Sequence, residues 1–112
     1  MDYLNNISTL YERDLIITEI EAYKRKDLDS IRKSFLDQIQ DLDIDDLYKK
    51  LKKVEIVKIV LAIEPTVGIL NKIRDFFDTN YDQKVIFDYE TDKSMLGGIK
   101  IIYKGKYFDY SV

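Results

Sequence analysis

The chain has 112 residues, 46% of them hydrophobic, and its 18 basic and 21 acidic side chains give a net charge of −3. This composition suits one packed domain, or one domain with a helical extension, and it gives no cationic excess that would attract nucleic acid. Cysteine and histidine are absent, which excludes disulfides, the usual zinc sites and Ser-His or Cys-His nucleophile pairs. No apolar run approaches the roughly 20 residues of a membrane helix, so we expect no membrane insertion.

The first half of the sequence, residues 1–53, is predicted to be helical. Over residues 1–26 apolar side chains recur at spacings of three and four, which indicates a helix with a wide apolar face. Asp27 is a candidate N-cap for a second helix with the same spacing over residues 28–42, and Asp45 is a candidate N-cap for a shorter third helix. Because neither Pro nor Gly precedes Pro65 in this region, fusion of adjacent helices stays open. The third helix would end in a turn of four cations, Lys49, Lys50, Lys52 and Lys53.

Residues 54–63, VEIVKIVLAI, are β-branched and almost continuously apolar. This composition is typical of a strand that is buried on both faces in the middle of a small sheet. Pro65 follows in a position suited to a first helical turn, and a helical stripe then runs over residues 67–77. A strand–helix–strand unit of this length favours parallel pairing of residues 55–63 with 84–90 through a right-handed crossover.

The last stretch, residues 84–112, is predicted to form three strands joined by two short turns. Its side chains alternate with the period of two that a half-buried strand requires. Gly97-Gly98 interrupts the alternation at a point where no side chain fits or φ must be positive. Lys104-Gly105 has the pattern of a two-residue hairpin turn. The sequence therefore predicts an α+β fold, in which N-terminal amphipathic helices precede a strand–helix–strand unit and a C-terminal β-hairpin within a small mixed sheet.

The same stretch also resembles a known family. The segment Asp92-Lys93-Ser94-Met95-Leu96-Gly97-Gly98, followed by a hairpin and Asp109-Tyr110-Ser111, is similar to the C-terminal signature of the F-type ATP synthase delta subunit, the oligomycin-sensitivity-conferring protein of mitochondria. That family ends in Asp-Pro-Ser-Leu-Ile-Gly-Gly, a short hairpin and Asp-x-Ser, with the same spacing from the second glycine to the last Asp. Lys93 departs from the usual Pro, and Lys104-Gly105 departs from the commoner Gly-Asp or Gly-Asn turn. The resemblance covers about residues 54–112, and its structural motif falls on Gly97, Gly98, Gly105, Asp109 and Ser111.

The resemblance implies a domain organisation and a role. Residues 54–112 would form a delta-like C-terminal α/β domain behind a helical segment of residues 1–53. The chain would be a non-catalytic stator subunit that links the peripheral stalk to the catalytic head of a rotary F-type or F-like ATPase. Its expected partners are peripheral-stalk b-type helices and, secondly, the N-terminal helices of alpha subunits, although residues 1–53 offer about half the helical length the family uses for the latter. The expected location is cytoplasmic, peripheral to the membrane.

Two other interpretations stay open. The E-type stator subunit of vacuolar and archaeal ATPases also ends in a Gly-Gly strand and hairpin, but a long coiled coil precedes it, and residues 1–53 show no sustained heptads. An unrelated small α+β protein-binding module is the other alternative. A structure in which residues 54–63 do not pair with 84–90 would favour it.

Aromatic residues concentrate in the predicted helix and hairpin of the second half. Tyrosine and phenylalanine are enriched at protein interfaces because they bury much area at a small entropic cost. We therefore expect a partner helix to dock in an apolar groove between the amphipathic helices and the sheet. The predicted protein-binding residues are Phe76, Phe77, Tyr107 and Phe108.

The remaining patterns do not predict a catalytic, metal or cofactor site. Gly97-Gly98 is followed by a strand, whereas a phosphate-binding loop leads into a helix. The scattered acids have no accompanying nucleophile or phosphate motif. Three alternating acids resemble the start of a calcium loop, but Asp46 and Lys52 stand where such a loop needs Gly and Glu. These three acids are Asp41, Asp43 and Asp45.

Overall fold

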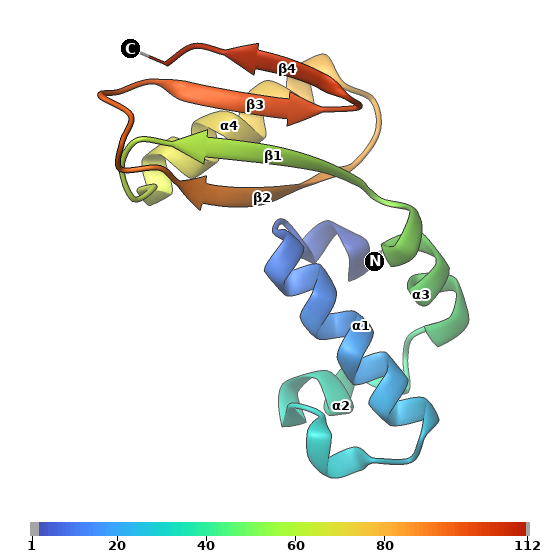
Figure 1. Ribbon diagram of the computed structural model, residues 1–112. Coiled ribbons are helices and arrows are strands. Elements are labelled where there is room, and N and C mark those ends of the chain that lie inside the picture. The colour runs from blue at the N-terminus through green and yellow to red at the C-terminus, as the bar shows by residue number, and fades with distance from the viewer. Residues whose placement is uncertain (1–2, 112) are drawn as a thin grey trace. The chain divides into compact units, whose positions relative to one another are not determined.

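The computed structural model describes residues 3–111 and has an α+β architecture, as the sequence predicts (Figure 1). Met1, Asp2 and Val112 belong to predicted segments but lie outside the described residues. Contacts divide the chain into two compact units, one ending at Val54 and the other beginning at Glu55.

The first unit contains α-helices and two short 3-10 helices, one before α1 and one between α1 and α2. Its elements are η1 (Tyr3–Asn6), α1 (Leu10–Lys24), η2 (Leu28–Ser30), α2 (Lys33–Ile39) and α3 (Ile44–Lys53). The helix predicted over residues 1–26 is present as α1, but the prediction that it begins at the start of the chain is wrong, because Thr9 starts it with a capping box. The Thr9 hydroxyl accepts from the Glu12 backbone N–H at 3.2 Å, and the Glu12 carboxylate accepts from the Thr9 N–H at 3.1 Å.

Both predicted aspartate caps are also wrong. The Asp27 side chain caps no helix and instead accepts a hydrogen bond from the Ser30 hydroxyl at 2.7 Å. Helix α3 is capped by Asp43, whose carboxylate accepts from the Asp46 N–H at 3.1 Å, while Asp45 pairs with Lys24 at 3.1 Å. Aspartates that alternate in the sequence offer several equivalent caps, and the turn of the chain decides between them.

A buried carboxylate joins α1 to the start of α2. Glu19 is 1% exposed. It accepts hydrogen bonds from the Arg32 backbone N–H at 2.7 Å and from Arg32 Nε at 2.9 Å. Arg32 is the N-cap residue of α2 and makes no side-chain cap of its own. Glu19 therefore supplies, from another helix, the acceptor that this helix start lacks.

The second unit is a four-stranded sheet with one crossover helix, α4, and the strand order β2-β1-β3-β4 (Figure 1). Strand β1 pairs with β2 in parallel, with Val57 opposite Phe87, which confirms the predicted pairing. On its other side β1 pairs antiparallel with β3, and β3 forms a hairpin with β4. The elements are β1 (Glu55–Leu61), α4 (Val67–Asn80), β2 (Val85–Thr91), β3 (Ile99–Tyr103) and β4 (Lys106–Asp109).

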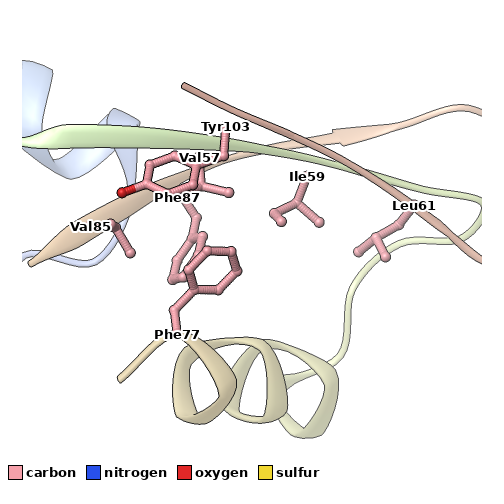
Figure 2. Close-up of a cluster of buried hydrophobic side chains, with 7 residues drawn as sticks. All are labelled: Val57, Ile59, Leu61, Phe77, Val85, Phe87 and Tyr103. Carbon is pink, nitrogen blue, oxygen red and sulfur yellow. The ribbon is translucent and has the colours of Figure 1, made fainter. Parts of the chain in front are cut away.

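Helix α4 packs on one face of this sheet. Phe77 projects from the helix onto Phe87, with ring centroids 5.3 Å apart (Figure 2). Alternate side chains of β1 point to the same face and are buried, but Ile56 on the opposite face is 37% exposed. The prediction that this strand is buried on both faces is therefore wrong, since nearly continuous apolar composition does not reveal which face a helix covers. The buried cluster is Val57, Ile59, Leu61, Phe77, Val85, Phe87 and Tyr103.

Two glycines allow the chain reversals around β3. Gly98 has φ of +83°, and a Cβ atom there would lie 2.1 Å from the Tyr110 carbonyl oxygen. The β3–β4 turn has positive φ at both central residues, Lys104 (+51°) and Gly105 (+75°), as a tight hairpin requires. The predicted two-residue turn is therefore present. The close approach at Gly98 seats the end of the hairpin against the start of β3, where the Tyr110 N–H donates to the Ile99 carbonyl at 2.8 Å.

Candidate functional site

Helix α4 lies over the β2 side of the sheet. The guanidinium carbon of Arg74 is 4.3 Å from the centroid of the Phe87 ring, and its Nη1 donates to the Val85 carbonyl at 2.8 Å. Both of these partners belong to β2. On the β3 side, Ile99 and Ile101 pack against the same cluster but are only partly buried. One helix therefore leaves part of this sheet face uncovered.

An apolar groove of about 410 Å³ occupies the uncovered part. Its lining residues come from α4 and the Tyr81 that follows it, from β3, and from β4 and the Tyr110 that follows it. Among the lining residues within 3–111, Lys72 is the only charged one. The lining consists of Lys72, Ile73, Phe76, Phe77, Tyr81, Ile99, Ile101, Tyr103, Phe108 and Tyr110.

The width of the sheet explains the groove. Four strands about 4.8 Å apart place the axes of the two outer strands about 14 Å apart, whereas a helix with its side chains is about 10 Å across. A single helix therefore does not cover the whole face of such a sheet. The part left uncovered lies over β3 and β4, where the groove lies.

Stacked aromatic rings hold the inner end of the groove in place. Phe77 is 3% exposed and stacks on Tyr81 with centroids 5.2 Å apart, and Tyr81 meets Tyr103 edge to face at 5.5 Å. Each ring limits the rotation of its neighbour. This part of the lining is therefore already formed in the isolated chain.

The structure brings together three of the four predicted binding residues. Phe76 is 53% exposed and Phe108 is 40% exposed, and both line the groove. Phe77 also lines it, but as a core side chain. Tyr107 does not belong to the described lining, because it alternates with Phe108 along β4 and faces the other side of the sheet.

Some lining residues were not predicted from the sequence. Tyr110 is one of them, and its alternation with Phe108 was a usable signal. Ile99, Ile101 and Tyr81 gave no such signal, because their place depends on where α4 crosses the sheet.

One Asp-x-Ser turn follows β2, and a second begins at the end of β4 and contains the motif residues Asp109 and Ser111. The Ser111 N–H donates to Asp109 Oδ1 at 2.8 Å, and the Ser94 N–H donates to Asp92 Oδ1 at 3.0 Å. Each serine hydroxyl donates to the same carboxylate oxygen. These hydrogen bonds, more than the nearby charge of Lys100, hold the pKa of both aspartates below the usual value. Gly97 lies in the bend just before β3.

These turns predict a loss of stability in acid. A carboxyl whose pKa is lower in the folded chain stabilises it above the unfolded pKa of about 3.9, and that contribution disappears as the pH falls through the folded value. We expect the urea midpoint to fall between about pH 5 and pH 2 more steeply for the natural chain than for an Asp92→Asn/Asp109→Asn variant. Parallel curves for the two proteins would contradict this. Circular dichroism at each pH provides the measurement.

Several of the other charged residues considered from the sequence interact with near neighbours in the first unit. Asp43 caps a helix and Asp45 pairs with Lys24. Within residues 3–111 no group of three or more acidic side chains is placed to hold a metal ion. In the lysine-rich turn, Lys52 lies 5.4 Å from the centroid of the Tyr48 ring.

No helix within residues 3–111 combines the length and the apolar character needed to cross a membrane.

Comparison of the sequence with models of known protein families gives a match. The family model described as ATP synthase delta (OSCP) subunit matches residues 28–112, more than half of the chain. The match includes the predicted region 54–112 and begins earlier, at the start of η2. A comparison with curated proteins gave no match.

Proposed function

This chain belongs to the ATP synthase delta (OSCP) subunit family, and on that premise we propose that it links the peripheral stalk of a rotary F-type or F-like ATPase to its catalytic head. The family is one of structural stator subunits. The chain would catalyse no reaction. It would resist torque while the catalytic head is active. Membership in the delta family argues against the E-type alternative, and the parallel pairing of β1 with β2 argues against an unrelated module.

The groove beside α4 is the proposed docking site for a b-type helix of the stalk. The observation that carries this proposal is the open groove over β3 and β4, whose lining is almost entirely apolar. An amphipathic helix laid there would bury the exposed faces of Phe76 and Phe108. Helix-in-groove binding of this kind uses apolar anchors at spacings of three, four and seven.

The first unit is the proposed contact for the N-terminal helices of alpha subunits. The three α-helices that the structure describes in this unit are fewer than the family uses for this purpose, so the stalk is the principal partner. We assign residues 1–53 to this helical segment and residues 54–112 to the delta-like docking domain. The proposed location is the cytoplasmic side of the membrane, where partner subunits would hold the chain.

Co-purification tests the proposed function. A tagged form of the chain is expressed in the source cells and recovered from solubilised membranes, and the associated subunits are identified by mass spectrometry. We expect ATPase stalk and head subunits with the natural chain and with Leu96→Asp. We expect them to be depleted at least about tenfold with Phe108→Asp, because a charge in an apolar interface costs more than 1.4 kcal/mol.

Leu96 is the matched control because it is 88% exposed and lies outside the groove lining. Recovery of the natural chain without any ATPase subunit would reject the role. If both variants deplete the ATPase subunits equally, the docking site lies outside the groove.

A further inference from the structure

We propose that the helix held in this groove carries acidic side chains along the edges of its apolar face. The inference rests on the proposed docking function and adds the chemistry by which the partner is selected. It follows from the charges at the groove rim.

Lys72 is the cation on the helical rim. It precedes Phe76 by one turn of α4, so both side chains project from the same side of the helix toward the groove. Arg74, by contrast, projects toward β2 and lies 3.6 Å from Asp78. Lys72 makes no ion pair or hydrogen bond with any residue from 3 to 111. Its charge is therefore available to a partner.

The hairpin supplies further cations on the opposite rim. Lys106 alternates with Tyr107 along β4, so it shares the sheet face of Phe108. Its side chain is exposed and makes no ion pair within the described part of the chain. Lys104, in the turn, lies 5.3 Å from the centroid of the Tyr103 ring, which belongs to the lining. Cations thus stand on both sides of the apolar floor.

The carboxylates near these strands are directed elsewhere. Asp109 follows Phe108 and faces the other side of the sheet, where Ser111 binds it. Glu90 pairs with Lys58 at 2.9 Å, also on that other face. No carboxylate belongs to the groove lining within residues 3–111. A chain with a net charge of −3 therefore presents a locally positive groove, and electrostatic complementarity selects an acidic partner.

Two designed peptides test the inference with the full chain. Both are helix-stabilised, about four turns long, and have the same apolar face. One carries glutamate and the other lysine at the flanking positions. Fluorescence anisotropy gives the Kd of each. We expect the glutamate peptide to bind about tenfold more tightly at low salt, as three exposed pairs of a few tenths of a kcal/mol each imply. This advantage should shrink as salt is added.

Charge reversal in the chain provides the matched comparison. Lys72→Glu/Lys106→Glu should abolish or invert the preference between the peptides. Lys33→Glu/Lys49→Glu makes the same change in net charge at two exposed lysines outside the lining and should leave the preference unchanged. Circular dichroism confirms that each variant is folded.

The outcomes separate this inference from the docking function. Equal binding of both peptides, or tighter binding of the lysine peptide, overturns the acidic preference while docking in the groove still stands. Binding of neither peptide overturns both. A preference that survives Lys72→Glu/Lys106→Glu also overturns the inference, because the selecting charges would then lie elsewhere.

Discussion

Replacing Phe77 by alanine is expected to lower the free energy of unfolding by about 3 to 5 kcal/mol, the usual cost of removing a buried aromatic ring. Phe77 is almost fully buried, and its ring contacts those of Phe87, Tyr81 and Tyr103. Its loss leaves a cavity between α4 and the sheet. Urea unfolding followed by circular dichroism measures the change.

The neighbouring phenylalanine is the control for this experiment. Phe76 is on the same helix but is mostly exposed, so Phe76→Ala should change the free energy of unfolding by less than about 1 kcal/mol. The same variant should weaken capture of stalk subunits. A stability loss at Phe76 equal to that at Phe77 would show that the groove wall belongs to the core and not to an interface.

Replacing Gly98 by alanine is expected to lower the free energy of unfolding by about 3 kcal/mol, and to loosen β4 first. Left-handed φ costs an alanine about 1 to 2 kcal/mol, and its methyl group would collide with the Tyr110 carbonyl. That carbonyl is main chain and cannot move without breaking the hairpin end. Hydrogen exchange should show that the Tyr110 amide loses protection before the amides of β1 do.

Gly105 separates these two causes. It also has positive φ, but a Cβ atom there would meet no other atom within 4 Å. Gly105→Ala should therefore cost only the conformational part, about 1 to 2 kcal/mol. If both substitutions lower the free energy of unfolding by the same amount, the close approach at Gly98 does not contribute to stability.

Local chemistry made much of the second unit predictable. The β-branched run before Pro65 marked the central strand, and Gly105 marked the hairpin turn. The parallel partner of β1 followed from the length of the crossover. These features are set by residues close together in the sequence, and general rules of backbone geometry apply to them directly.

Features that depend on distant residues were not predictable. The contact between Glu19 and Arg32 joins two helices without any motif in the sequence. The exposed face of β1 depends on there being one helix in this unit against four strands. The groove lining depends on the direction in which α4 crosses the sheet. The choice of Tyr107 in place of Tyr110 is a different kind of error, because strand alternation already puts Tyr110 on the face of Phe108. The predicted aromatic residues were of the right kind, but alternation along β4 decides which of them reach the groove.

The strand order also affects how the chain folds during synthesis. Strand β1 is made first among the strands yet lies between two strands made later. About 40 residues separate the end of β1 from the end of β3, which at 5 to 20 residues per second is a delay of about 2 to 8 seconds on the ribosome. During that interval the backbone of β1, an apolar segment, has no hydrogen-bonded neighbour strand on one or both of its edges. Nascent chains should therefore need chaperone protection at this stage, well before the hairpin closes the sheet.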